Sequence, residues 1–157
     1  MFKKVLVPLD GSQFSQCSLD YVRAIARGCN VPDITLLRVV EPLASTDTAA
    51  PAQAGGKSMA KLDSASESEA RDYVLSLAKK LSGEGLPVKG EVVSGRADEA
   101  IVDYSRKNKI DLIIMSSHGR SGLSRWVIGS VADRVMQYSV IPVLLIPTPG
   151  CRVAQGF

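Results

Sequence analysis

A stretch rich in glycine and serine, residues 115–131 (MSSHGRSGLSRWVIGSV), contains the residue types that bind phosphate groups. Gly119 and Gly122 let a ligand approach the main chain, and Gly129 and Ser130, which offers a hydroxyl, stand where a further helix is expected to begin. Inward-pointing amides, a hydroxyl and a helix N-terminus are the groups that hold a phosphate chain. The stretch has neither the Gly-Lys-Ser/Thr of a P-loop nor the GxGxxG of dinucleotide-binding proteins. It therefore indicates a phosphate-binding loop, and a loop that only turns the chain is the alternative.

Five short apolar runs alternate with segments of helical spacing, and these elements must position the phosphate-binding loop. Runs that are apolar on both faces are typical of buried parallel strands. The sequence therefore predicts an α/β fold, a five-stranded parallel, doubly wound sheet with helices on both faces. Ligands bind such a sheet beyond the carboxyl ends of the strands where the winding reverses, which favours the segments after the first and fourth strands. The predicted strands are 5–9, 34–40, 87–93, 111–115 and 143–146, and the predicted helices follow an N-cap at Ser12 and cover about 70–81, 97–109 and 127–138.

Composition excludes several classes of protein. The chain has 157 residues, which fits one domain, and its net charge of +3 is too small to suggest a nucleic-acid partner. No apolar run approaches the ~20 residues of a membrane-spanning helix, and Pro8 interrupts the first run too early for a signal peptide. We therefore expect a cytoplasmic protein without membrane insertion. With three cysteines and a single histidine, a zinc site is not expected.

Two segments fall outside the predicted strands and helices. Residues 42–57 are small, polar and broken by proline and glycine, so they predict a mobile loop rather than a linker between domains. Residues 149–157 are expected to form a C-terminal tail after a single domain spanning 1–148.

Four motifs resemble the universal stress protein family: VPLDGS at 7–12, LLRVVE at 36–41, SSHGRSGL through GSV at 116–131, and PVLLI at 142–146. The resemblance covers about residues 1–148 and implies a Rossmann-like, adenine nucleotide alpha hydrolase-like sheet. The ATP-binding branch of the family is marked by Gly, two residues, Gly, nine residues, then Gly-Ser/Thr. Gly119, Gly129 and Ser130 match the last part of that motif. The first glycine falls on Ser116, a departure that would crowd the pocket if a positive φ were needed there.

The resemblance also implies a role for individual residues. Asp10 matches the family's aspartate near the ribose, where a carboxylate accepts from sugar hydroxyls or holds Mg²⁺ through water. A helix-capping aspartate is the alternative for this position. Val39 matches the position whose backbone contacts the adenine edge. The other implied contacts of ATP are Pro8, Leu9, Met115, Ser116, Gly119, Gly129, Ser130 and Val131.

As a whole, the resemblance implies a regulatory protein of the stress response that binds ATP and hydrolyses it slowly or not at all. Residues 115–131 contain no phosphate-gripping lysine and no water-positioning glutamine, and we assign no catalytic residue. Ser116 favours an alternative in which the protein is an interaction module that binds no nucleotide. A preference for AMP or cyclic AMP is a third hypothesis.

The last predicted strand, 143–146, is expected at an edge of the sheet. A bare apolar edge promotes aggregation, and pairing with a second copy across a twofold axis removes that edge. The resemblance implies the same homodimer, and coverage of the edge by the tail from residue 148 is the alternative. An unidentified protein is the other expected partner.

Overall fold

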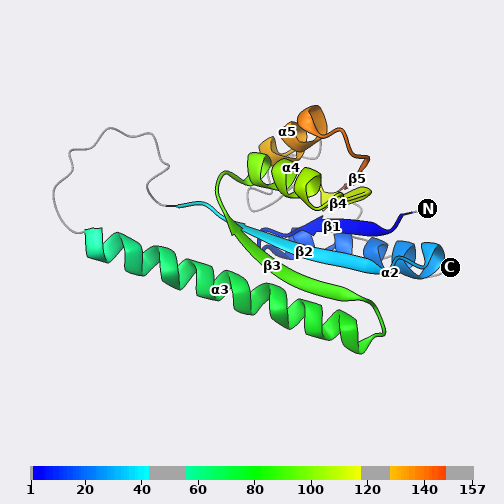
Figure 1. Ribbon diagram of the computed structural model, residues 1–157, viewed down its shortest axis with the longest axis horizontal. Coiled ribbons are helices and arrows are strands. Elements are labelled where there is room, and N and C mark those ends of the chain that lie inside the picture. The colour runs from blue at the N-terminus through cyan, green and yellow to red at the C-terminus, as the bar shows by residue number, and fades with distance from the viewer. Residues whose placement is uncertain (1, 43–55, 118–127, 148–157) are drawn as a thin grey trace.

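The structure is a computed structural model that describes residues 2–42, 56–117 and 128–147. For residues 56–63 it describes the backbone alone. Five parallel strands form one sheet in the order β3-β2-β1-β4-β5 (Figure 1). They are β1 (Lys4–Pro8), β2 (Asp33–Val40), β3 (Val88–Ser94), β4 (Leu112–Ser116) and β5 (Val143–Ile146). The predicted five-stranded parallel sheet is confirmed, with each strand within about one residue of its predicted bounds.

Helices cover both faces of the sheet (Figure 1). One apolar core joins the sheet to α2 and α3 through residues such as Val22 and Leu81. A second core on the other face joins it to α4 and α5 through Ile101 and Val135. The doubly wound architecture is therefore confirmed. The helices are α1 (Gln13–Gln16), α2 (Ser18–Cys29), α3 (Gly56–Gly83), α4 (Ala97–Lys107) and α5 (Ser130–Tyr138).

The prediction was wrong about the start of α3. This helix begins at Gly56, so Gly56 and Lys57 lie in a helix rather than in the expected loop, while residues 43–55 lie outside the described residues. Residues 64–69 are exposed and, apart from Ala65, polar, and they lack the apolar spacing that predicted a helix from residue 70. Extending an existing helix costs far less than nucleating one, so helix-forming residues there need no apolar face.

Tyr138 also departs from the prediction, which placed it on the apolar face of the last helix. Val135 is fully buried, but Tyr138 is 64% exposed at the end of α5. None of the helices in the described ranges is long and apolar enough to cross a membrane. A cytoplasmic location stays a prediction, and the tail at 149–157 lies outside the described residues.

Close packing of α3 on the sheet predicts an effect of mutating Gly90 in β3. A Cβ added to Gly90 would lie 2.9 Å from both the carbonyl carbon and the carbonyl oxygen of Val74 in α3. We expect Gly90→Ala to lower the free energy of unfolding by about 1–3 kcal/mol, because the new methyl group would clash with backbone atoms of Val74, which cannot move aside as a flexible side chain can. Urea denaturation would measure this loss. Gly28→Ala is the control, because a Cβ there meets nothing within 4 Å, and equal losses in the two variants would contradict the packing argument.

Candidate functional site

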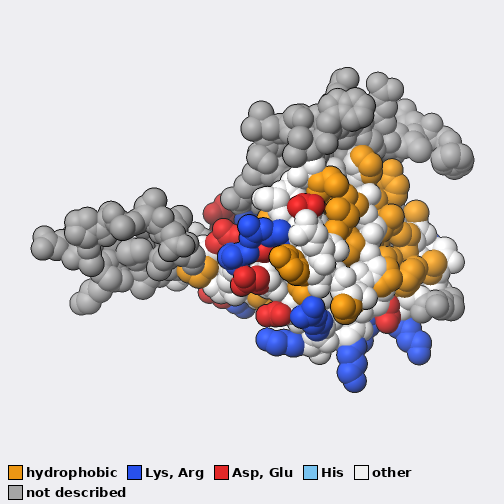
Figure 2. Space-filling view, turned by 90° about the horizontal axis from the view of Figure 1, so that it is seen from above, with side chains coloured by type: hydrophobic (Ala, Val, Ile, Leu, Met, Phe, Trp, Pro, Cys, Tyr) orange, Lys and Arg blue, Asp and Glu red, His pale blue; other side chains and the backbone are white. Residues whose placement is uncertain are grey.

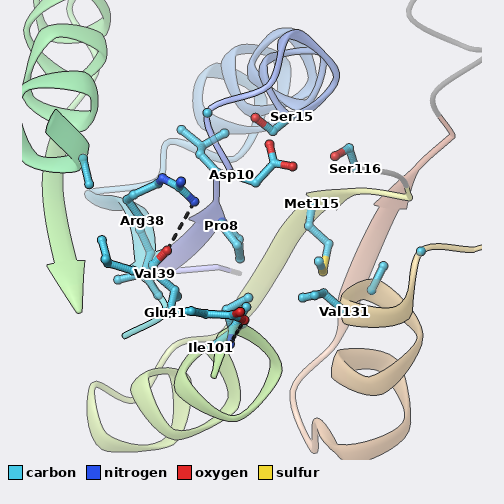
Figure 3. A pocket seen from close by; sticks show the side chains of 18 of the residues that line it. Pro8, Asp10, Ser15, Arg38, Val39, Glu41, Ile101, Met115, Ser116 and Val131 are labelled. Atoms are coloured by element: carbon cyan, nitrogen blue, oxygen red, sulfur yellow. Dashed lines mark hydrogen bonds between the residues drawn. The ribbon is translucent and has the colours of Figure 1, made fainter. Parts of the chain in front are cut away.

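A pocket of about 700 Å³ opens at the carboxyl ends of β1, β2 and β4 (Figure 3). The turn after β1 forms one side, and the N-terminus of α5 lies beside the end of β4. α3 and the first residues of α4 complete the wall. The pocket thus lies where the sequence predicted a site, next to the switch in winding between β1 and β4.

Nearly all the predicted site residues are brought together by this pocket. They come from four segments of the chain that are distant in sequence. Gly119 lies outside the described residues. The predicted residues that line the pocket are Pro8, Leu9, Asp10, Val39, Met115, Ser116, Gly129, Ser130 and Val131.

Asp10 shapes the turn between β1 and α1. Its Oδ1 accepts hydrogen bonds from the backbone N of Ser12 (2.9 Å) and from the Ser12 hydroxyl (2.6 Å). Ser12 Oγ in turn accepts from the backbone N of Ser15 (3.2 Å), which confirms Ser12 as an N-cap. Gly11 has a φ of +86°, a conformation that glycine adopts without strain. Asp10 therefore organises the turn before α1 while also lining the pocket, but the residue that caps this helix is Ser12 rather than Asp10.

The N-terminus of α5 forms a polar part of the pocket wall. Gly129 is its N-cap and has no side chain to accept from the first-turn amides, while its carbonyl oxygen accepts from the backbone N of Asp133 (2.9 Å). The Gly129 N–H donates to the carbonyl of Ser117 (2.8 Å), which fixes the helix start beside β4. A helix N-terminus of this kind favours an anion through its amides and its dipole.

Ser116, the residue that departs from the family motif, is the last residue of β4 and pairs with Ile146 of β5. Within the described ranges, the non-glycine residues with positive φ are Asn30 and Lys109. The crowding that a positive φ would have caused is therefore not present at Ser116.

One wall of the pocket was missed by the sequence analysis. Ser66, Glu69, Ala70 and Tyr73 follow each other on one face of α3, at the spacing of successive helical turns. Because this face mixes polar and apolar residues, a search for apolar periodicity does not detect it. The other missed lining residues are Gly11, Ser15, Leu37, Arg38, Val40, Glu41, Ala97, Ile101, Ser117 and Ala132.

Two charged side chains from the end of β2 contact backbone groups at the pocket. Arg38 Nη1 donates to the carbonyl oxygen of Val39 (3.2 Å). Glu41 Oε1 accepts from the backbone N of Ala97 (3.1 Å), so it satisfies an amide at the start of α4. The pocket and the first turn of α4 are therefore joined through Glu41.

A buried carboxylate ties α4 to α5, the two helices on this face of the sheet. Asp98 Oδ2 accepts from Arg96 Nη2 (2.7 Å) and from Arg134 Nη1 (3.2 Å), and the Asp98 side chain is 10% exposed. Hydrogen bonds from Arg96 and then Arg134 lower the pKa of Asp98 to about 2, against the opposing effect of burial. The ion pairs hold together the helix starts that present Ala97 and Ser130 to the pocket.

The Universal stress protein family matches residues 1–147 of the chain. The chain belongs to the universal stress protein family. Universal stress protein MJ0531 of Methanocaldococcus jannaschii is 31% identical over 150 residues, which are 95% of this chain and 84% of that protein. MJ0577 from the same organism is 30% identical over 155 residues, 93% of this chain and 95% of that protein.

Solved structures of this family share the fold. The structure of MJ0577 superposes with a TM-score of 0.79 at 28% identity, covering 93% of this chain and 96% of that one. Universal stress protein UspA from Lactobacillus plantarum gives a TM-score of 0.78 at 25% identity, covering 92% and 97%.

The Asp98 ion pairs of this universal stress protein predict an acid-sensitive contribution to stability. The folded-state pKa of about 2 lies below the ordinary aspartate pKa of 3.8, so the contribution is complete above about pH 4 and is lost as the pH falls toward 2. We expect Asp98→Asn to lower the free energy of unfolding at pH 7 by about 2 kcal/mol and to flatten its decline below about pH 4. Asp103→Asn, on an exposed position of the same helix, is the control. Denaturation curves from pH 7 to 2.5 that run parallel for Asp98→Asn and the wild type would contradict this prediction.

Proposed function

We propose that the pocket binds an adenine nucleotide, with MgATP as the favoured form, and that the protein acts as a regulatory protein of the stress response. One observation carries the proposal. Nine of the ten residues that the family resemblance implied as nucleotide contacts line a single pocket, although they come from distant parts of the chain. If the family resemblance had no bearing on the site, these nine positions would not be expected to line one and the same pocket.

The distribution of polar and apolar groups suits the parts of a nucleotide. Pro8, Val39, Ile101 and Met115 supply apolar surface for a flat base (Figure 3). Hydroxyls of Ser116 and Ser130 and the N-terminus of α5 supply donors for phosphates.

Mg²⁺ fits this site as part of the nucleotide complex. Asp10 contributes a carboxylate near the serine hydroxyls, and no group of three or more metal-ligating side chains occurs in the part of the chain that the structure describes. Mg²⁺ is commonly held by one or two carboxylates together with substrate phosphates and water. Asp10 would hold the ion, which would neutralise phosphate charge.

Nucleotide complexes of proteins with this fold support the proposal at the level of the fold. A universal stress protein solved with cAMP gives a TM-score of 0.61 at 21% identity. A family member from Arabidopsis thaliana solved with AMP bound gives a TM-score of 0.59 at 16% identity. AMP and cAMP are therefore the competing ligands to measure beside ATP.

Slow or absent hydrolysis follows from the groups that line the pocket. Its charged lining residues in the described ranges are Asp10, Arg38, Glu41 and Glu69, and none is a lysine. Asp10 Oδ1 already accepts two hydrogen bonds from Ser12, and Glu41 Oε1 accepts from Ala97. A fast ATPase requires a positioned base or water-orienting group beside the phosphates. We therefore propose that the protein holds its nucleotide rather than turning it over rapidly.

Calorimetric titration of MgATP into nucleotide-stripped protein tests the proposal. We expect micromolar binding, and we expect Gly129→Val to abolish it because the new side chain enters the phosphate end of the pocket. Gly83→Val is the matched control, because a Cβ at the end of α3 meets nothing within 4 Å. Circular dichroism would verify that both variants fold. Absence of binding to the wild type, or equal binding by Gly129→Val, would contradict the proposal and favour the nucleotide-free interaction module.

We also propose that the protein forms a homodimer through β5. This strand lies at an edge of the sheet, and its Val143, Leu144 and Leu145 are only partly buried. Apolar side chains gather on the face of the molecule shown in Figure 2. The helix that precedes β5 in the chain, α5, and the residues on either side of it add exposed apolar side chains, which are Ile128, Met136, Tyr138 and Val140.

Sedimentation velocity tests the dimer. We expect a dimer at micromolar concentration, and we expect Val140→Asp to weaken association at least about tenfold, because a buried unpaired charge is costly. Val140 is 81% exposed, so the substitution should leave the monomer folded. Leu75→Asp on α3, 50% exposed on the opposite face of the sheet, is the control. A wild-type protein that sediments as a monomer at these concentrations would contradict the proposal.

A further inference from the structure

Hydrogen bonds join α4 to α5, which lie side by side on one face of the sheet (Figure 1). Arg134 Nη1 in α5 donates to Asp98 Oδ2 in the first turn of α4 (3.2 Å). Arg106 Nη2 in the last turn of α4 donates to the carbonyl oxygen of Tyr138, the last residue of α5 (3.1 Å). The first contact lies at the end of α4 that lines the pocket through Ala97, and the second lies at the opposite end.

The Asp98 carboxylate gives α5 a fixed point of attachment. Its side chain is 10% exposed, whereas the side chains of Arg96 and Arg134 are each 50% exposed. Arg96 binds it through two hydrogen bonds, from Nε to Oδ1 (3.1 Å) and from Nη2 to Oδ2 (2.7 Å). A bidentate pair of this kind fixes the orientation of a carboxylate. Arg134 therefore meets an acceptor that is already held in place.

The same turn of α4 is joined to the opposite side of the pocket. Glu41 lines the pocket after β2, and its Oε1 accepts from the backbone N of Ala97 (3.1 Å). Contacts therefore run from Glu41 through the start of α4 to α5, whose first residue, Ser130, also lines the pocket. Asp98 and Arg134 are not among the described lining residues, so they connect the two sides from behind the wall.

The direction of α5 matters most for the phosphate-suited end of the pocket. Hydrogen bonds from the first-turn amides and from the Ser130 hydroxyl need donor–acceptor distances of about 2.5–3.2 Å, whereas apolar contact with a base has no such requirement. The bond from the Gly129 N–H to the Ser117 carbonyl fixes one point at the helix start. One point does not fix the direction of an axis, and the pair of Arg134 with Asp98 supplies a second.

We propose that Asp98 and Arg134 are positioning residues, which hold the N-terminus of α5 in place for the phosphates of a bound nucleotide. This inference rests on the proposed nucleotide-binding function. The ion pair orders in advance a helix start that the nucleotide would otherwise have to order at the expense of its affinity. Breaking the pair therefore weakens the binding of a ligand that carries phosphates and spares the binding of the nucleoside alone.

Calorimetric titrations of MgATP and of adenosine, which has the base and sugar but no phosphate, test this proposal. Arg134→Met is the first variant, because Arg134 is half-exposed and its loss leaves Asp98 paired with Arg96. We expect MgATP to bind about three to ten times more weakly than to the wild type, the range that one hydrogen bond supplies, and adenosine to bind within about twofold.

Asp98→Asn separates positioning from charge. The two substitutions change the net charge near the phosphates in opposite directions. If charge alone mattered, Arg134→Met would weaken MgATP and Asp98→Asn would strengthen it. Positioning predicts that both variants weaken MgATP. It also predicts that the double variant binds no more weakly than the weaker single variant, because both substitutions break the same contact.

Arg106→Met is the matched control. It also removes an arginine that joins α4 to α5, but at the end away from the pocket. We expect wild-type affinity for MgATP in this variant, even if its stability falls. Circular dichroism would verify the fold of each variant, and the comparison of Arg134→Met with Arg106→Met stands by itself if Asp98→Asn does not fold.

Several results would overturn the proposal. Arg134→Met could bind both ligands as the wild type does, or lose affinity for both by the same factor, and neither result fits a role at the phosphate end. Tighter MgATP binding by Asp98→Asn would assign the effect to charge. Equal losses in Arg106→Met and Arg134→Met would assign it to a general loosening of the two helices. In all these cases nucleotide binding itself would stand, whereas a wild-type protein that binds neither ligand would end the proposed function and this inference together.

Discussion

The pairing of β1 with β4 is the constraint on which the rest of the structure depends. These strands are distant in sequence but adjacent in the sheet, with Val5 opposite Leu112 and Leu6 opposite Ile113. At the amino ends, the Asp111 carboxylate accepts from the backbone N of Lys3 (2.8 Å) and of Lys4 (2.9 Å), which fixes the register. Along the chain β1 is followed by α2, which packs on one face of the sheet, and β4 is followed by α5, which packs on the other (Figure 1). The pocket opens where these two paths of the chain separate.

The walls of the pocket depend on contacts made away from it. Gly90 lies close to the backbone of Val74, so α3 packs directly against β3. The residues of α3 that line the pocket lie before Val74 in the same helix. A hydrogen bond from Gln16 Nε2 to the Tyr73 hydroxyl (3.4 Å) joins α1 to the same wall. On the opposite face, Asp98 holds the starts of α4 and α5 together. Packing within the fold thus determines where the binding groups lie.

Much of this fold could be predicted from the sequence, because the central strands β1 and β4 are mostly apolar and are buried on both faces. Leu6 and Ile113 are 0% exposed, and a run buried on both faces admits few other structures. The start of α3 could not be predicted, because residues 64–69 carry no apolar face. The contacts of Arg38 with Val39 and of Glu41 with Ala97 escaped prediction for another reason. They depend on the direction of a side chain in the folded structure, which periodicity does not encode.

The central claim is that one pocket at the carboxyl ends of β1, β2 and β4 holds a nucleotide. Backbone amide spectra of ¹⁵N-labelled protein, recorded while MgATP is added, test the claim most directly. We predict that the largest shifts map to Leu9, Asp10, Val39, Ser116 and Ser130, and that amides at the far end of the sheet, such as Lys4 and Leu112, stay unchanged. Spectra that stay constant at saturating MgATP, or shifts that map away from this pocket, would contradict the account.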